Sequence, residues 1–157
     1  MKTFLICHRG ALGDFILTWP AILCLRKVLP EYHFLGIGRA EYMKLAISFG
    51  ILDTYIDNES ARLLDFFCGK RIPEEIGSPH AAILWLTNGQ ETVDILKQTS
   101  SLPIVCIPPF PEKQIHLAKY YCSVIQSHFP IKIPQDLSDC FPAKPREEQY
   151  ALIHPGS

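Results

Sequence analysis

Apolar runs of strand length alternate along the chain with segments in which hydrophobic residues recur every three or four positions. The first kind of segment is typical of parallel strands covered on both faces, and the second of helices packed on such a sheet. The pattern predicts strands at residues 3–7, 33–37, 54–56, 81–86 and 103–107, and helices at residues 15–29, 40–49, 59–68, 91–98 and 112–129. This order predicts an α/β fold with a mainly parallel sheet and helices on both faces.

Proline and glycine residues mark the boundaries of these segments. Pro20 lies inside the expected helix 15–29, where it either opens a regular helix after an irregular first turn or kinks that helix. Residues 130–145 contain four prolines and are typical of an extended linker. Residues 150–154 then form one more apolar run. We therefore expect a first domain with its linker at residues 1–145, and the first strand and turn of a missing second domain at residues 146–157.

Composition limits the classes of protein to consider. The 157 residues are 48% hydrophobic and 20% charged, which favours a globular chain with a real core. The formal net charge is −1, so no global electrostatic case for a nucleic-acid partner exists. No apolar run approaches the length of a membrane span, and the N-terminus lacks the pattern of a secretory signal. The six cysteines lie mostly in apolar stretches without C-x-x-C spacing, which predicts buried reduced thiols and a cytosolic protein.

The turn after the first strand carries the chemistry that the sequence suggests. Gly10 and Gly13 allow a close approach of ligand or backbone, or a positive φ, but G-x-x-G spacing also suits a merely structural turn. Asp14 either caps the following helix or points into a cleft as a proton acceptor. Arg9 is either a phosphate contact or a solvated loop residue, and His8 is expected to be a solvated loop histidine. Trp85 is expected in the core.

A longer motif around this turn points to a family. Residues 8–21 read HRGALGDFILTWPA and resemble the N-terminal motif of the glycosyltransferase family 9 heptosyltransferases. Residues 33–49, 83–89 and 116–121 resemble further segments of that family, and the ending at residues 154–157, His-Pro-Gly-Ser, resembles the opening of its second domain. Asn88 stands where the family usually has Gln, and Leu86 where it often has Asp, so the acceptor cannot be carried over from the family.

The resemblance implies a Rossmann-like domain that is the N-terminal half of a GT-B glycosyltransferase. It implies that Asp14 is the catalytic base and that neither a metal ion nor another cofactor is required. The substrate-binding residues that we expect, from this resemblance and from the anion-binding chemistry of the turn, are Arg9, Gly10, Ala11, Leu12, Gly13, Asn88, Gly156 and Ser157. Residues 10–13 would lie near the donor diphosphate, and Gly156 and Ser157 would begin the donor-side phosphate turn.

The leading hypothesis is therefore an inverting heptosyltransferase-like enzyme in truncated form, inactive without its second half. Its partners would be ADP-heptose as donor and a lipid-linked, phosphorylated core sugar of lipopolysaccharide as acceptor. It would work in the cytoplasm, with transient contact to the inner membrane surface. The alternative is a non-catalytic, stand-alone binding module of Rossmann-like or flavodoxin-like form.

Overall fold

The computed structural model describes residues 2–98, 103–109, 111 and 114–141. These residues form one sheet of five parallel strands: β1 (Lys2–His8), β2 (Tyr32–Gly38), β3 (Thr54–Asp57), β4 (Ala81–Trp85) and β5 (Ile104–Cys106). The helical elements are α1 (Leu12–Ile16), α2 (Trp19–Val28), α3 (Ala40–Ser48), the 3-10 turn η1 (Ala61–Leu63), α4 (Leu64–Phe67), α5 (Gln90–Lys97), α6 (Leu117–His128) and the 3-10 turn η2 (Leu137–Cys140).

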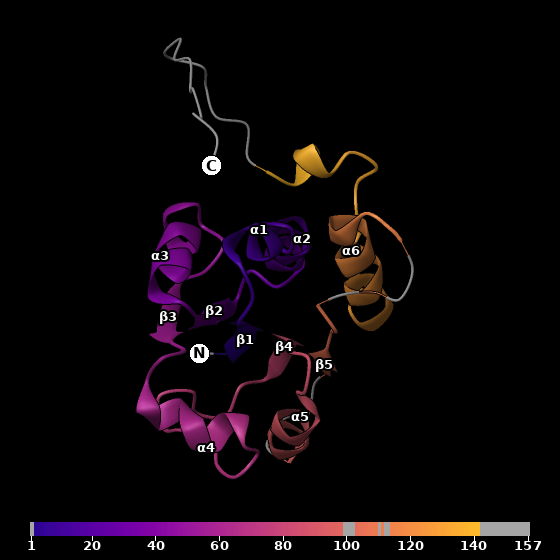
Figure 1. Ribbon diagram of the computed structural model, residues 1–157. Helices are drawn as coiled ribbons and strands as arrows, with labels where there is room; N and C mark the ends of the chain where they lie inside the picture. Colours follow the sequence, from indigo (N-terminus) through magenta and orange to yellow (C-terminus); the bar gives the residue numbers. More distant parts are fainter. Residues whose placement is uncertain (1, 99–102, 110, 112–113, 142–157) are drawn as a thin grey trace.

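The sheet order is β3-β2-β1-β4-β5, and every pairing is parallel. Helices α1, α2, α3 and α6 cover one face of the sheet, and α4 and α5 cover the other (Figure 1). The predicted α/β fold, with its parallel sheet and two helical layers, is confirmed. The order 3-2-1-4-5 is that of a Rossmann-like sheet, whereas a flavodoxin-like sheet has the order 2-1-3-4-5. The flavodoxin-like form of the alternative hypothesis is therefore wrong for the described sheet.

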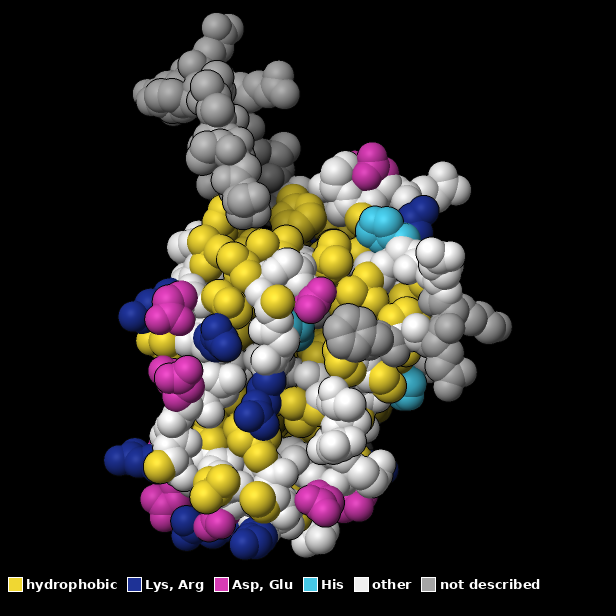
Figure 2. Space-filling model, viewed as in Figure 1, with side chains coloured by type: hydrophobic (Ala, Val, Ile, Leu, Met, Phe, Trp, Pro, Cys, Tyr) yellow, Lys and Arg dark blue, Asp and Glu magenta, His cyan; other side chains and the backbone are white. Residues whose placement is uncertain are grey.

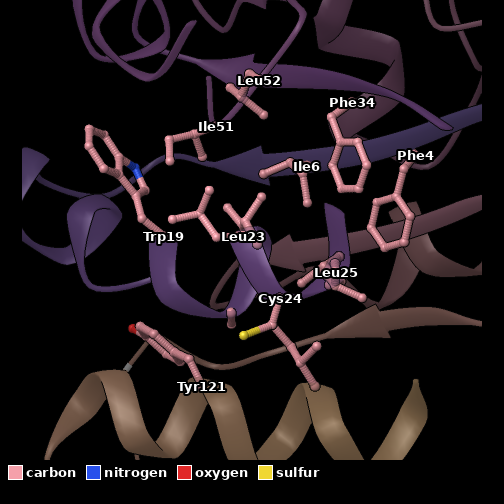
Figure 3. Close-up of a cluster of buried hydrophobic side chains, with 14 of the residues drawn as sticks. Phe4, Ile6, Trp19, Leu23, Cys24, Leu25, Phe34, Ile51, Leu52 and Tyr121 are labelled. Carbon is pink, nitrogen blue, oxygen red and sulfur yellow. The ribbon is translucent and has the colours of Figure 1, made fainter. Parts of the chain in front are cut away.

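Central strand β1 supplies both hydrophobic cores, because successive side chains of a strand point to opposite faces. Phe4 and Ile6 join the cluster under α2 and α6, while Leu5 and Cys7 join the cluster over α4 and α5. All four residues are fully buried. Figure 3 shows the first cluster, in which the ring of Phe4 lies beside that of Phe34, with a centroid distance of 5.0 Å.

The expected helix 15–29 is divided into α1 and α2. Leu17 and Thr18 separate the two helices, and the Thr18 hydroxyl donates a hydrogen bond of 2.7 Å to the carbonyl of Phe15. Pro20 occupies the first turn of α2, where its missing N–H has no helical partner to lose. Of the two roles considered for Pro20, the opening of a regular helix after an irregular turn is confirmed.

Two other expected helices are shorter than predicted. Residues 59–68 form only η1 and the single turn α4, and α6 begins at Leu117, since residues 114–116 are not helical. Ile115 had suggested a longer amphipathic helix, but its side chain is 45% exposed and joins no core.

The expected second domain at residues 146–157 and the end of the linker lie outside the described residues. Over the residues that the structure describes, no helix is both long and apolar enough to cross a bilayer.

All six cysteines lie within the described ranges and are free thiols. The exposed one is Cys68, Cys106 is partly covered, and the buried ones are Cys7, Cys24, Cys122 and Cys140. The Sγ atoms of Cys24 and Cys140 are 3.5 Å apart, so this contact joins α2 to η2. The prediction of mostly buried thiols is confirmed, with Cys68 as the exception.

Candidate functional site

The strand order creates a switch point between β1 and β4. From β1 the chain moves outward to β2 and β3, and then returns to the other side of β1 to form β4. The loops after β1 and β4 therefore diverge, and open α/β sheets bind their ligands in the crevice that such loops leave. His8 and Trp85 are paired at the carboxyl ends of these two strands.

A pocket of about 440 Å³ occupies this switch point. This volume lies within the usual range for small-molecule sites. The lining comes from the turn after β1, from the end of β4 and its loop, from the last residue of α4 and from the segment after β5. The residues are His8, Arg9, Gly10, Asp14, Phe67, Trp85, Leu86, Thr87, Asn88 and Pro109.

The structure brings together only part of the expected site. Asp14, Arg9, Gly10 and Asn88 all line the pocket, although Asn88 follows Asp14 by more than seventy residues. The expected binding residues outside this lining are Ala11, Leu12 and Gly13. Gly156 and Ser157 lie outside the described residues. Among the described residues, no three His, Cys, Asp or Glu side chains come together in a way that could hold a metal ion.

Asp14 is the third residue of α1 and does not cap it. The N-cap position belongs to Ala11, and no side chain makes a capping hydrogen bond. Within the described part of the chain, the structure shows no hydrogen bond or ion pair to the Asp14 carboxylate. Burial raises the pKa of Tyr121, and the negative charge of Asp14 raises it further, to about 12. A half-buried carboxylate at the pocket is therefore available to accept a proton.

Arg9 is held at the rim of the pocket by an aromatic ring. Its guanidinium carbon lies 4.5 Å from the ring centroid of Phe67, a cation–π distance, and its side chain remains exposed. On the face shown in Figure 2, acidic and basic side chains are scattered, with hydrophobic surface between them. An anionic ligand on this face would depend on individual cations rather than on a broad basic surface.

His8 is the functional candidate that the sequence interpretation missed. The expectation of a solvated loop histidine is wrong: β1 extends one residue further than predicted, and His8 is only 2% exposed. Its ring packs against the rings of Phe15 and Trp85, with centroid distances of 5.1 and 6.3 Å. Burial lowers the pKa of His8 to about 4, so the imidazole is neutral near pH 7. Its position directly after an apolar run was the signal that could have indicated a strand end.

Gly10 keeps a space open between His8 and Asp14. A methyl group added at Gly10 would lie 3.0 Å from His8 Cε1, 3.5 Å from His8 Nε2 and 3.7 Å from Asp14 Oδ2. The same addition at Gly13 would meet nothing within 4 Å. Neither glycine has a positive φ. Of the two reasons considered for a glycine in this turn, a positive φ applies to neither, and the groups that approach Gly10 are the side chains of His8 and Asp14.

Trp85 is a core residue that also forms part of the pocket wall. It is 2% exposed, which confirms the expected burial, and its ring packs against Tyr121 with a centroid distance of 5.7 Å. Two enclosed nitrogen atoms, Trp85 Nε1 and His8 Nδ1, have no hydrogen-bond partner among the described residues. These two nitrogen atoms lie inside the protein, behind the pocket wall that His8 and Trp85 help to form.

The buried imidazole of His8 predicts a loss of stability in acid. Because the pKa of His8 is about 4 in the folded chain and 6.5 in an unfolded one, the unfolded chain binds a proton here at higher pH. The contribution of the neutral His8 imidazole to the free energy of unfolding is complete above about pH 6.5. It decreases by about 3 kcal/mol as the pH falls toward 4. Urea unfolding at several pH values in this window should show the decrease in the wild type and a smaller one in His8→Phe. Equal pH dependence in the two proteins would contradict this assignment.

Comparison with known proteins gives a structural match and no sequence match. No family model and no curated protein sequence matches the chain. A family 9 glycosyl transferase from Veillonella parvula matches with a TM-score of 0.61 and 19% identity, over 85% of this chain and 42% of that one. The heptosyltransferase WaaC of E. coli, in its structure with ADP, matches with a TM-score of 0.60 and 14% identity, over 86% of this chain and 49% of WaaC.

The chain shares the fold of part of these glycosyltransferases. A second structure of WaaC, with ADP-2-deoxy-2-fluoro heptose, agrees, with a TM-score of 0.58 and 13% identity over 88% of this chain and 53% of that one. The chain thus spans about half the length of these proteins. The expected Rossmann-like half of a GT-B glycosyltransferase is confirmed as a fold.

Proposed function

We propose that this chain is the acceptor-side half of a heptosyltransferase-like glycosyltransferase. One observation carries the proposal: the Asp14 carboxylate stands without a partner among the described residues in the pocket at the β1–β4 switch point. The fold is shared with heptosyltransferases, and Asp14 belongs to the motif that resembles theirs. The reaction would transfer a heptose from ADP-heptose to the phosphorylated inner core of lipopolysaccharide, with inversion at the anomeric carbon.

The pocket contains the groups that this reaction needs on the acceptor side. Asp14 would take the proton of the acceptor hydroxyl while the hydroxyl oxygen bonds to the anomeric carbon of the donor. The bond from that carbon to the diphosphate oxygen breaks, and ADP leaves with the electron pair. Arg9 would pair with a phosphate of the acceptor, because a guanidinium forms charge-assisted bonds to phosphate oxygens. Asn88 and Thr87 would offer hydrogen bonds to sugar hydroxyls.

The nucleotide-sugar donor would be bound by the second half of such an enzyme. WaaC has been solved with ADP and with a fluorinated ADP-heptose analogue. By analogy, Gly156 and Ser157 would begin the phosphate turn for the donor, and residues 10–13 would face its diphosphate. We place the reaction at the cytoplasmic face of the inner membrane, where a lipid-linked acceptor would be met.

Ligand binding and turnover together test the proposed function. Deacylated lipopolysaccharide inner core, added to the ¹⁵N-labelled 157-residue chain, should shift the amide signals of Arg9, Gly10 and Asn88. The complete gene product should transfer heptose from ADP-heptose to the same acceptor. Binding without transfer by the complete gene product would favour the non-catalytic module, and neither binding nor transfer would overturn the proposal.

A further inference from the structure

His8 and Asp14 approach the same small volume from two sides. The point that a methyl group on Gly10 would occupy is 3.5 Å from His8 Nε2 and 3.7 Å from Asp14 Oδ2. All three residues line the pocket. His8 Nε2 and Asp14 Oδ2 therefore face the same position at Gly10, where no side chain stands, and a ligand oxygen in the pocket can approach both groups from there.

The surroundings of the ring determine which nitrogen carries the proton. A neutral imidazole has one N–H donor and one acceptor nitrogen. Nδ1 is enclosed and has no hydrogen-bond partner among the described residues, whereas the Cε1–Nε2 edge faces Gly10 and the pocket. A proton on Nδ1 would be a buried donor without an acceptor, which is costly. On Nε2 the same proton can be donated to whatever fills the pocket, so we expect the Nε2–H tautomer.

The geometry points to His8 as a second catalytic residue, whose Nε2–H donates a hydrogen bond to the oxygen of the acceptor hydroxyl that Asp14 deprotonates. The inference rests on the proposed function and adds to it a second group that holds the nucleophile. The hydroxyl proton passes to Asp14, the oxygen bonds to the anomeric carbon, and the imidazole keeps its own proton throughout. The missing side chain of Gly10 leaves the approach of this oxygen to both groups open.

A neutral imidazole suits this role better than a charged one. An imidazolium beside Asp14 would stabilise the carboxylate and weaken it as a base. The ring is instead kept neutral by burial, in contact with the rings of Phe15 and Trp85. One donated hydrogen bond then orients the hydroxyl, with its proton toward the carboxylate, without lowering the basicity of Asp14.

Kinetics of three variants test the role of His8 in the complete gene product, with ADP-heptose and deacylated inner core as substrates. His8→Phe keeps an aromatic ring but removes both nitrogens, and should lower kcat about 100-fold with little change in KM for the acceptor. His8→Gln places an amide N–H near the position of Nε2. Its kcat should therefore be about 10-fold higher than that of His8→Phe. Gly10→Ala fills the space and should lower kcat by about the same factor as His8→Phe.

The control is His128→Gln, the same substitution at an exposed residue in the last turn of α6, which should leave kcat unchanged. Thermal unfolding of each variant separates loss of folding from loss of activity. Wild-type kcat in His8→Phe, or no recovery in His8→Gln relative to His8→Phe, would overturn the inference.

A measurement without turnover covers the case in which His8→Phe does not fold. The ¹⁵N chemical shifts of His8 in the wild-type 157-residue chain identify its tautomer near pH 7. Protonation at Nε2 is expected, and protonation at Nδ1 would overturn the inference. Failure of the proposed function gives a different result, because the wild-type complete gene product would then show no transfer. An inactive Asp14→Asn together with a fully active His8→Phe removes only the role of His8.

Discussion

Asp14→Asn should lower the kcat of sugar transfer about 1000-fold in the complete gene product, with little change in folding. Asn keeps the size and one carbonyl oxygen of Asp but cannot accept a proton at neutral pH. The side chain makes no capping bond in α1, so its loss as a base does not remove a structural contact of that helix. Initial rates of ADP release with saturating donor and acceptor measure the effect.

The matched control is Asp57→Asn, which changes the same chemistry at the carboxyl end of β3, outside the pocket lining. The Asp57 carboxylate accepts a hydrogen bond of 3.1 Å from the backbone of Glu59, which an Asn oxygen can also accept. Asp57→Asn should therefore keep its rate within about twofold of wild type. Equal activity of Asp14→Asn and Asp57→Asn would remove Asp14 from the mechanism.

Phe4→Ala should lower the free energy of unfolding by about 3–5 kcal/mol, the usual cost of removing a large buried ring. Phe4 is fully buried in β1, and its ring lies 5.0 Å from Phe34 and 5.4 Å from Phe129. Since Phe34 comes from β2 and Phe129 directly follows α6, the substitution opens a cavity where the sheet and this helix meet. Urea denaturation followed by far-UV circular dichroism measures the change.

Phe49→Ala provides the comparison for this prediction. Phe49 is 49% exposed at the end of α3, and its ring packs on one side against Trp19 at 5.5 Å. Removal of a half-exposed ring leaves little cavity, so the loss should be about 1 kcal/mol or less. A similar loss in the two variants would mean that the cluster around Phe4 is not the main core.

Strands β1 and β4 were predictable because burial on both faces leaves uninterrupted apolar runs. The structure ends β1 at His8, one residue later than predicted, and ends β4 at Trp85, one residue earlier. Helices that border irregular turns were harder to predict. The break before α2 depends on the hydrogen bond of Thr18 to its own preceding turn, and the start of α6 depends on whether Ile115 finds a partner in the core.

The site was predictable where its residues are neighbours in sequence or, as with Asn88, fall in a segment that resembles the family. Arg9, Gly10 and Asp14 could be assigned to one turn from their spacing and from the family resemblance. Phe67 and Pro109 could not, because they come from α4 and from the segment after β5, and only the strand order brings them to the same pocket. The role of His8 was hidden because a one-residue extension of β1 moves this side chain from the solvent into the pocket wall.

The distribution of the cysteines makes the pocket accessible to fluorescence spectroscopy without any substitution. Cys68 is exposed and directly follows Phe67, the residue whose ring carries Arg9 at the pocket rim. Burial raises the pKa of Cys7 and Cys122 to about 12 and about 11, and also raises that of Cys106, so these thiols are poor nucleophiles near neutral pH. A maleimide dye should therefore label Cys68 first and report directly on sugars or phosphates that enter beside Arg9.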